Sequence, residues 1–212
     1  FITFVSMWNF GVNIAAPFFN VYMIEYLNMG YFAIALFSQV IGNIVTILCI
    51  GYWGRLVDRF GCKPVMIICC SISVILPFLW IFATPSNYFI VLLINLITGI
   101  VTPGYELTAM NLSIWLAPEK NRSIYIALYT LINAIFGIAL AYISGGLLME
   151  FMRPVLDKLA VPFIIGQKLN AYHVLFIVSA FLCFFTISLL PKRIKEHDAK
   201  PVNELLKNLG NK

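Results

Sequence analysis

Two long apolar stretches of the chain are separated by the sequence Gly51-Tyr52-Trp53-Gly54-Arg55-Leu56-Val57-Asp58-Arg59-Phe60-Gly61-Cys62-Lys63-Pro64. Gly54 and Gly61 permit close backbone approach or a positive φ. Asp58 can accept hydrogen bonds at a helix N-terminus, where the macrodipole favours an anion. The three basic residues of the stretch can pair with Asp58 or with lipid phosphates. This pattern is typical of a tight connector that works as a latch, holding in one conformation and breaking in another.

The composition on either side of this connector is that of a membrane protein. Of the 212 residues, 61% are hydrophobic and only 11% are charged, whereas soluble domains carry roughly a quarter charged residues. Too few charges remain to cover a globule of this size in water. The same numbers exclude a disordered chain, a coiled coil and, despite the net charge of +5, a nucleic-acid binder.

Six apolar stretches are long enough to cross a membrane, since a hydrocarbon core of about 30 Å needs about 20 apolar residues in a helix. The expected spans, numbered first to sixth, are Phe1–Ile24, Phe32–Ile50, Pro64–Phe82, Tyr88–Leu116, Ser123–Leu148 and Ala171–Leu190. The sequence therefore predicts an all-α membrane protein, with a transmembrane bundle over 1–190 and a basic cytoplasmic tail over 191–212.

The basic residues give the orientation. Most of the 14 lysine and arginine residues follow the second and fourth spans or lie in the tail, and the connectors after the first and third spans have none. Basic residues concentrate on the cytoplasmic side of a membrane. We therefore expect a multi-pass protein of the cell membrane, surrounded by lipid, with both termini in the cytoplasm.

Amides and carboxylates are costly inside a membrane, so the helix faces that they share are informative. Candidate cavity-lining residues come from the first, second and fourth spans: Asn9, Asn13, Asn20, Gln39, Asn43, Asn95, Thr102 and Glu106. Within each span they are four or seven residues apart, which is the spacing of one helix face. The third and sixth spans contain no Asn, Gln, Asp or Glu. We expect the first and fourth spans to line an aqueous path, the second and fifth to support it, and the third and sixth to face lipid.

An alternative for each amide is a hydrogen bond between helices, worth about 0.6–2 kcal/mol. The sequence does not decide between the two for a single residue, although such bonds have no reason to avoid both the third and the sixth spans. The fifth span carries Asn133 and, on what we predict to be the opposite face, a stripe of small residues, Gly137, Ala141 and Gly145. Small residues allow close helix approach.

Within the connector, Gly54-x-Leu56-x-Asp58-Arg59-x-Gly61-x-Lys63 resembles the signature loop of the major facilitator superfamily, which follows the second helix of each six-helix half. Cys62 stands where a basic residue is commoner. The string Pro118-Glu119-Lys120-Asn121-Arg122 resembles that family's connector between its fourth and fifth helices. The resemblance covers essentially the whole chain. It implies that five residues of this loop form a cytoplasmic gating motif, namely Gly54, Asp58, Arg59, Gly61 and Lys63.

The resemblance also implies two inverted three-helix repeats, with the first helix of each repeat lining a central cavity. The family's N-terminal half often carries an arginine in its fourth helix, and the fourth span has none. The chain also begins within an apolar run and ends in a basic tail. We therefore expect the C-terminal half of a secondary active transporter, partnered by an N-terminal six-helix half. Whether the chain is a fragment or pairs with another chain is left open.

Glu106 is the one carboxylate well inside a span. It follows Thr102-Pro103-Gly104, where the proline removes a backbone donor and frees carbonyls, which we expect to face the cavity. Because the membrane interior disfavours a charged carboxyl, Glu106 is a candidate to carry a proton in one state and release it in another. The alternatives are a gate, an interhelical hydrogen bond, or simple exposure near the cytoplasmic mouth.

Other classes of protein fit less well. A membrane-embedded enzyme needs convergent ligands, but the chain has two histidines and no paired carboxylates within the spans. The five cysteines fit no metal or disulfide spacing, so we expect reduced packing residues, no metal and no cofactor. A non-transporting membrane scaffold is the alternative to a transporter. The sequence identifies neither the small-molecule substrate nor the choice between uniport, symport and antiport.

Overall fold

The computed structural model describes residues 1–87, 89–159, 169–189 and 205. Within these residues the chain is a bundle of helices, six stretches of which are long and apolar enough to cross a membrane. Each of these stretches overlaps one of the six predicted spans. The predicted tail over 191–212 lies outside the described residues, apart from Leu205, which is buried.

Several spans consist of more than one helical segment. The first comprises α1 (Ile2–Asn13) and α2 (Ala16–Glu25), and the second comprises α3 (Tyr31–Ile34), the π-helix η1 (Ala35–Ile41) and α4 (Gly42–Phe60). The third comprises α5 (Cys62–Ser73) and α6 (Ile75–Ile81), and the fourth is α7 (Phe89–Trp115). The fifth follows the short 3-10 helix η2 (Glu119–Asn121) and comprises α8 (Arg122–Ile132), the π-helix η3 (Asn133–Ala139) and α9 (Leu140–Leu159), and the sixth is α10 (Ala171–Leu189).

Two of the breaks follow from prolines. Pro17 and Pro77 have no N–H with which to bond the carbonyls four residues earlier, at Asn13 and Ser73. The helices α1 and α5 end at these two residues. A proline in the first and third spans thus produces the interruption that its missing donor predicts.

Pro103 lies inside α7 without ending it. The carbonyl four residues earlier belongs to Gly99, and the Thr46 hydroxyl of α4 donates to it at 3.3 Å. The Trp53 indole donates to the next carbonyl, that of Ile100, at 2.6 Å. The freed carbonyl is therefore satisfied by the second span and does not face the cavity as the sequence predicts.

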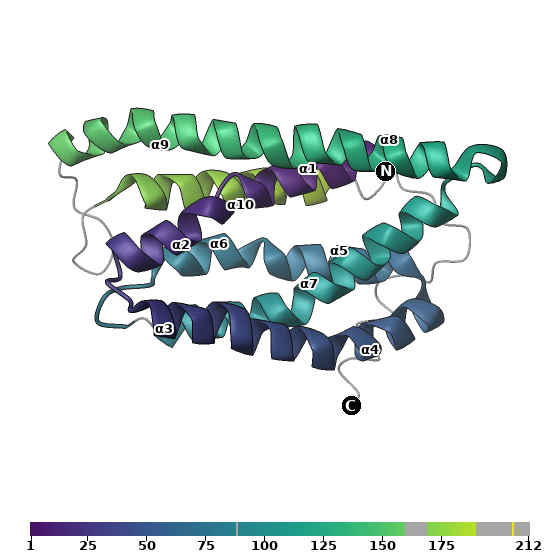
Figure 1. Cartoon of the computed structure of the whole chain (residues 1–212), viewed down its shortest axis with the longest axis horizontal. Helices are drawn as coiled ribbons and strands as arrows, with labels where there is room; N and C mark the ends of the chain where they lie inside the picture. The colour runs from purple at the N-terminus through teal and green to yellow at the C-terminus, as the bar shows by residue number, and fades with distance from the viewer. Residues whose placement is uncertain (88, 160–168, 190–204, 206–212) are drawn as a thin grey trace.

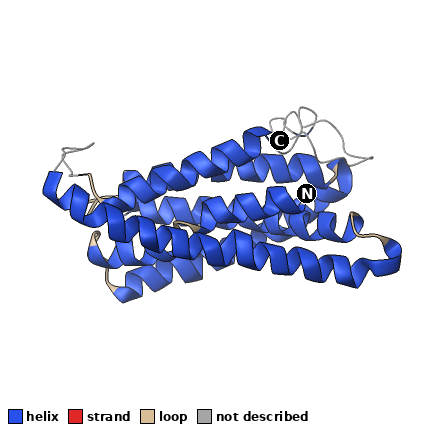
Figure 2. Ribbon diagram, turned by 90° about the horizontal axis from the view of Figure 1, so that it is seen from above, coloured by secondary structure: helices blue, strands red, loops and turns tan. Residues whose placement is uncertain are grey.

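The first span of each three-helix repeat packs against the second and third spans of the other repeat. The first span packs mainly against the fifth and sixth through contacts of α1 with η3 and α10, and α7 packs mainly against α4 and α5. Figure 1 shows α8 and α9 along one edge of the bundle and α3 and α4 along the other, with α1, α2 and α7 between them. Figure 2 shows the same helices from above, running along the long axis of the bundle.

The prediction that the third and sixth spans face lipid is wrong. Their most apolar stretches are 56% and 50% buried inside the chain, against 0% for the second span and 11% for the fifth. The absence of amides suits a helix packed among other helices as well as one in lipid. Small side chains at the contacts, such as the fully buried Cys69, Cys70 and Ala180, let these two spans pack centrally.

The structure also corrects two element boundaries. Helix α4 continues to Phe60 and α5 begins at Cys62, so the connector after the second span is the single residue Gly61. Its φ of 91° is a conformation that glycine adopts without strain. At the C-terminal end of the fifth span, α9 continues to Leu159, whereas the sequence predicts its end near Leu148.

Candidate functional site

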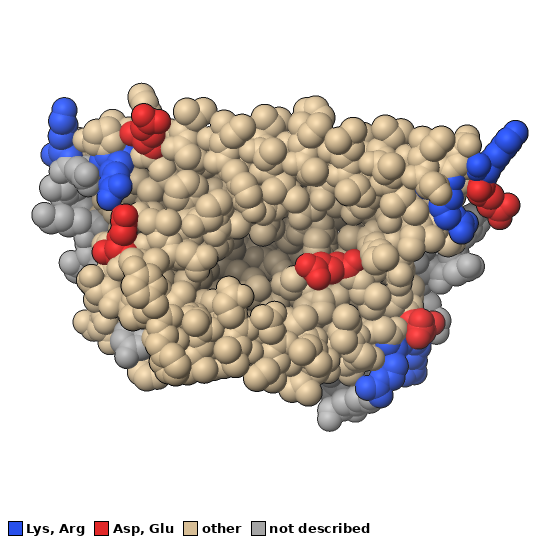
Figure 3. All heavy atoms as spheres, viewed as in Figure 1, with Lys and Arg blue, Asp and Glu red and all other residues tan. Residues whose placement is uncertain are grey.

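A cavity of about 470 Å³ lies between the first and fourth spans. Its wall includes residues of α1, α2, η1 and α7, and also residues of α5, α6 and α10. Figure 3 shows the hollow in the middle of one face of the molecule, with an acidic side chain beside it. The first helices of the two repeats therefore share one space.

Most of the predicted cavity residues lie on this wall, namely Asn9, Asn13, Asn20, Gln39, Asn95, Thr102 and Glu106. Asn43 is exposed on α4 and lies outside it. The reason is the π-helical winding of η1, whose wider turns move Asn43 off the face that it would share with Gln39 in a regular helix. Gly99 shares the predicted face of α7 but packs against the second span, where an added Cβ would lie 2.7 Å from the Gly42 carbonyl oxygen.

Asn9 joins three spans beside the cavity. Its side-chain N–H groups donate to the Tyr105 hydroxyl of α7 at 3.1 Å and to the Asn133 side-chain oxygen of η3 at 3.0 Å. Asn133 therefore lies on the same face of the fifth span as Gly137, whose added Cβ would meet Asn133 and Asn9, and not on the opposite face. For Asn9, the alternative of an interhelical hydrogen bond is the better description.

We expect Asn9→Ala to lower the thermal unfolding midpoint by about 3–6 °C, because it removes two partly buried hydrogen bonds worth about 1 kcal/mol each. The measurement is the temperature at which the purified protein loses its monodisperse peak in detergent. Asn20→Ala, at an exposed position of the same wall, is the matched control and should change the midpoint by less than about 1 °C. Equal shifts for the two variants would contradict the structural role of Asn9.

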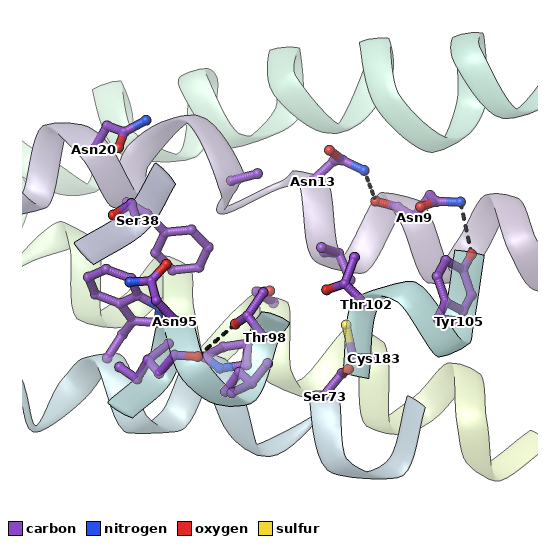
Figure 4. Close-up of a pocket in the computed structure, with 18 of the residues that line it drawn as sticks. Asn9, Asn13, Asn20, Ser38, Ser73, Asn95, Thr98, Thr102, Tyr105 and Cys183 are labelled. Atoms are coloured by element: carbon purple, nitrogen blue, oxygen red, sulfur yellow. Dashed lines mark hydrogen bonds between the residues drawn. The ribbon is translucent and has the colours of Figure 1, made fainter. Parts of the chain in front are cut away.

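Asn13 and Asn95 are positioned alike in the two repeats. Each donates its side-chain N–H to the backbone carbonyl four residues earlier in its own helix, Asn13 to Asn9 and Asn95 to Val91, both at 2.8 Å. The close-up in Figure 4 shows Asn13 and Asn95 on opposite sides of the cavity, with Thr98 and Thr102 of α7 nearby. The amides are thus held by their own helices and not by a neighbouring span.

Sequence reasoning missed the residues that the third and sixth spans supply. They are Ser73, Leu76, Pro77, Trp80, Ser179 and Cys183. Pro77 could have indicated this part of the wall, because the helix break that precedes it lies beside the cavity. The aromatic residues Trp8 and Phe19 of the first span were also missed, because a pattern of polar side chains does not register aromatic ones.

Residues of the predicted gating motif lie at the basic end of the bundle, close to the α4–α5 junction. Asp58 and Arg59 are exposed, and Lys63 is half-buried. Gly61 has the positive φ that the sequence predicts. Gly54 has open space around it, with nothing within 4 Å of an added Cβ, so it does not provide a close helix contact in this structure.

Arg59 of this motif and the neighbouring Arg55 have local partners. The Arg55 side chain donates through Nε to the Gly51 carbonyl at 3.2 Å. The Arg59 guanidinium lies 5.3 Å from the centre of the Phe60 ring, within the range of a cation–π contact. In this conformation the two arginines are therefore held within α4.

A second polar network lies at the opposite end of the bundle. Arg153 of α9 pairs with Glu25 of α2 at 3.2 Å, and the Tyr172 hydroxyl of α10 donates to the same carboxylate at 2.8 Å. Both members of the ion pair are substantially exposed, and exposed pairs contribute about 0–1 kcal/mol. The network aligns the ends of the first, fifth and sixth spans without adding much stability.

All five cysteines are free thiols, and Cys62, Cys69, Cys70 and Cys183 are buried. These four side chains therefore pack inside the bundle, whereas Cys49 is partly exposed. Across the part of the chain that the structure describes, no group of three or more His, Cys, Asp or Glu side chains is arranged to hold a metal ion.

Comparison with known proteins agrees with the geometry. A search of the curated proteins finds no match. The family model described as the Major Facilitator Superfamily matches residues 1–209, which is nearly the whole chain. Members of that family are transporters and not enzymes. On this match, together with six membrane-spanning helices, the chain belongs to the major facilitator superfamily.

Proposed function

We propose that the chain is the C-terminal six-helix half of a secondary transporter, which moves a small solute by alternating access. The observation that carries this proposal is the shared cavity. Polar side chains of the first and fourth spans, which begin the two repeats, line one space. Substrate sites of such transporters lie at the interface of repeats near the middle of the membrane.

Exposed apolar side chains of α4 and α9 support a partner half. Ile47 and Leu48 of α4 are 72% and 74% exposed, and Ile143 and Leu147 of α9 are 58% and 62% exposed. These two helices form opposite edges of the bundle (Figure 1). A second six-helix half seated across both edges would close the cavity, and lipid would cover the remaining apolar surface.

The charged ends support an orientation. The end that carries the gating motif, including Arg55 and Arg59, faces the cytoplasm of a cell-membrane protein by the distribution of basic residues. We propose that both termini are on the cytoplasmic side. The α4–α5 junction then acts as a cytoplasmic latch between conformations, with Asp58 as its anionic member.

Uptake by the full native protein in liposomes tests this function. We expect accumulation of at least one solute from a panel of sugars, amines, peptides and organic acids. The 212-residue chain reconstituted alone should give no uptake above empty liposomes, because one half cannot close the cavity on both sides. A non-transporting scaffold gives no uptake in either preparation, and robust uptake by the chain alone contradicts its assignment as a half.

We also expect Glu106→Gln to remove the dependence of uptake on an imposed pH gradient, because glutamine cannot take up and release a proton. In the unmodified protein an inward gradient of one pH unit should raise the accumulation ratio of the solute by up to about tenfold for one coupled proton, because one decade of gradient is worth about 1.4 kcal/mol. Glu150→Gln makes the same substitution at an exposed position of α9 outside the cavity. Unchanged gradient dependence in the Glu106 variant refutes the proton role.

A further inference from the structure

Two amides of the cavity wall, Asn13 and Asn95, present their oxygen atoms to a ligand together with the second N–H of each. A backbone carbonyl can only accept a hydrogen bond, so the side-chain atoms of Asn13 and Asn95 that contact one must be the NH2 groups. This fixes the orientation of both amides. Within the described residues, their side-chain oxygens keep both lone pairs for a ligand.

The hydroxyl groups of the wall are oriented in the same sense. Thr98 donates to the Ile94 carbonyl at 2.8 Å, Ser73 to the Cys69 carbonyl at 2.9 Å, and Ser179 to the Gly11 carbonyl at 2.7 Å. A hydroxyl has one proton and two lone pairs. With the proton directed at the backbone, the hydroxyls of Thr98 and Ser73 are acceptors toward the cavity, whereas Ser179 is fully buried. The exposed amides of Asn20 and Gln39 offer both donors and acceptors.

Among the described residues, the charge on the cavity wall is negative. Glu106 is exposed and lines the cavity, and no Lys, Arg or His among the described residues does so. An anion would therefore meet acceptor oxygens and a carboxylate without a counter-charge. A cation would meet a counter-charge and several acceptors.

Aromatic side chains complete the wall. Trp8, Phe19 and Trp80 all line the cavity, and the rings of Phe19 and Trp80 are stacked with centroids 4.7 Å apart. Aromatic faces attract cations and pack against apolar groups. The cavity thus offers an apolar surface next to acceptor oxygens.

We infer that the solute recognised by this half is a hydrogen-bond donor with an apolar or aromatic body, and in particular an organic cation, whose positive group lies at Glu106 and whose N–H groups meet the acceptor oxygens. The inference rests on the proposed transport function and names its substrate class. Sugars and neutral peptides share the donor groups but make no use of the carboxylate, and organic acids are excluded by it.

The test uses four probes of similar size: 2-phenylethylammonium, its N,N,N-trimethyl derivative, neutral 3-phenylpropanamide and anionic 3-phenylpropionate. Equilibrium binding of each is measured on the full native protein in nanodiscs. We expect 2-phenylethylammonium to bind at least about tenfold more tightly than 3-phenylpropionate, because only the cation gains a charge-assisted contact. Equal affinity for the two, tighter binding of the anion, or no binding of any probe would overturn the inference.

Two variants, with one control, test whether residues of the cavity wall cause the preference for cations. Glu106→Gln should weaken binding of both cations about tenfold and leave 3-phenylpropanamide unchanged, whereas Glu150→Gln should leave all four probes unchanged. Asn13→Leu keeps the number and branching of the side-chain heavy atoms and removes the amide, including its acceptor oxygen. It should weaken 2-phenylethylammonium about fivefold and spare the trimethyl derivative, which has no N–H to donate. If neither variant discriminates among the probes, the inference fails.

Flux measured on the same preparations separates this inference from the proposed function. Preferential cation binding without net transport contradicts the transport proposal and supports the assigned binding class. Transport of a solute by a protein that shows no cation preference contradicts the inference alone.

Discussion

Gly145→Ala should lower the thermal unfolding midpoint by about 5–10 °C. An added Cβ at this position of α9 would overlap the Ile14 carbonyl oxygen and approach the Phe18 ring to 3.1 Å. The obstruction is backbone, which cannot move aside by changing a rotamer. Separating α9 from the first span costs about 1–3 kcal/mol in typical overpacked sites, which for a chain of this size corresponds to several degrees.

The neighbouring glycine supplies the control. Gly146 has nothing within 4 Å of an added Cβ, so Gly146→Ala should leave the midpoint unchanged or raise it by about 2–3 °C through the higher helix propensity of alanine. Both variants are compared by heating in detergent, followed by size-exclusion chromatography. If both alanines shift the midpoint alike, close packing of the fifth span on the first is not what Gly145 provides.

Tyr22→Phe should lower the same midpoint by about 3–10 °C. Tyr22 is fully buried, and its hydroxyl donates to the Ala83 carbonyl at 2.9 Å and lies 3.4 Å from His173 Nε2. The Asn170 N–H donates to His173 Nδ1, which places the ring proton on Nε2. The tyrosine oxygen therefore accepts from the histidine while its proton goes to Ala83.

Loss of this hydroxyl removes the donor for one buried carbonyl and the acceptor for one ring N–H. Each such loss costs about 1–3 kcal/mol in a buried setting, and the shift follows from the size of the chain. Tyr142→Phe makes the same change on α9, where the side chain is 44% exposed, and should have no effect beyond about 1 °C. A Tyr22 variant as stable as the Tyr142 variant would mean that the chain from Asn170 to Ala83 carries no stability.

The six spans were predictable because the length of an apolar helix is set by the membrane and not by tertiary contacts. The prolines at positions 17 and 77 gave the interruptions for the same local reason, a missing N–H. The small residues of the fifth span were also informative, since Gly137, Ala141 and Gly145 do bring it close to the first span. These features depend on the chain's own backbone or on side-chain size alone.

The predictions failed where tertiary contacts, and not the local sequence, determine the environment of a residue. Absence of polar groups did not distinguish lipid from protein around the third and sixth spans. Asn43 lies away from the cavity beyond the π-helical η1, and no local sequence pattern reveals that winding. The sequence also does not distinguish the roles of Asn9 and Asn13. Both amides lie on one helix face, but only Asn9 forms hydrogen bonds with other spans.

Gly61 alone joins α4 to α5. Consecutive Cα atoms are about 3.8 Å apart, so the end of one helix cannot travel more than a few ångströms from the start of the next without unwinding. A tilt of the second span during a transport cycle must therefore drag the adjoining end of the third with it. Ser73 and Trp80, which line part of the cavity, belong to that same third span. A movement at the charged α4–α5 junction therefore changes the shape of the cavity.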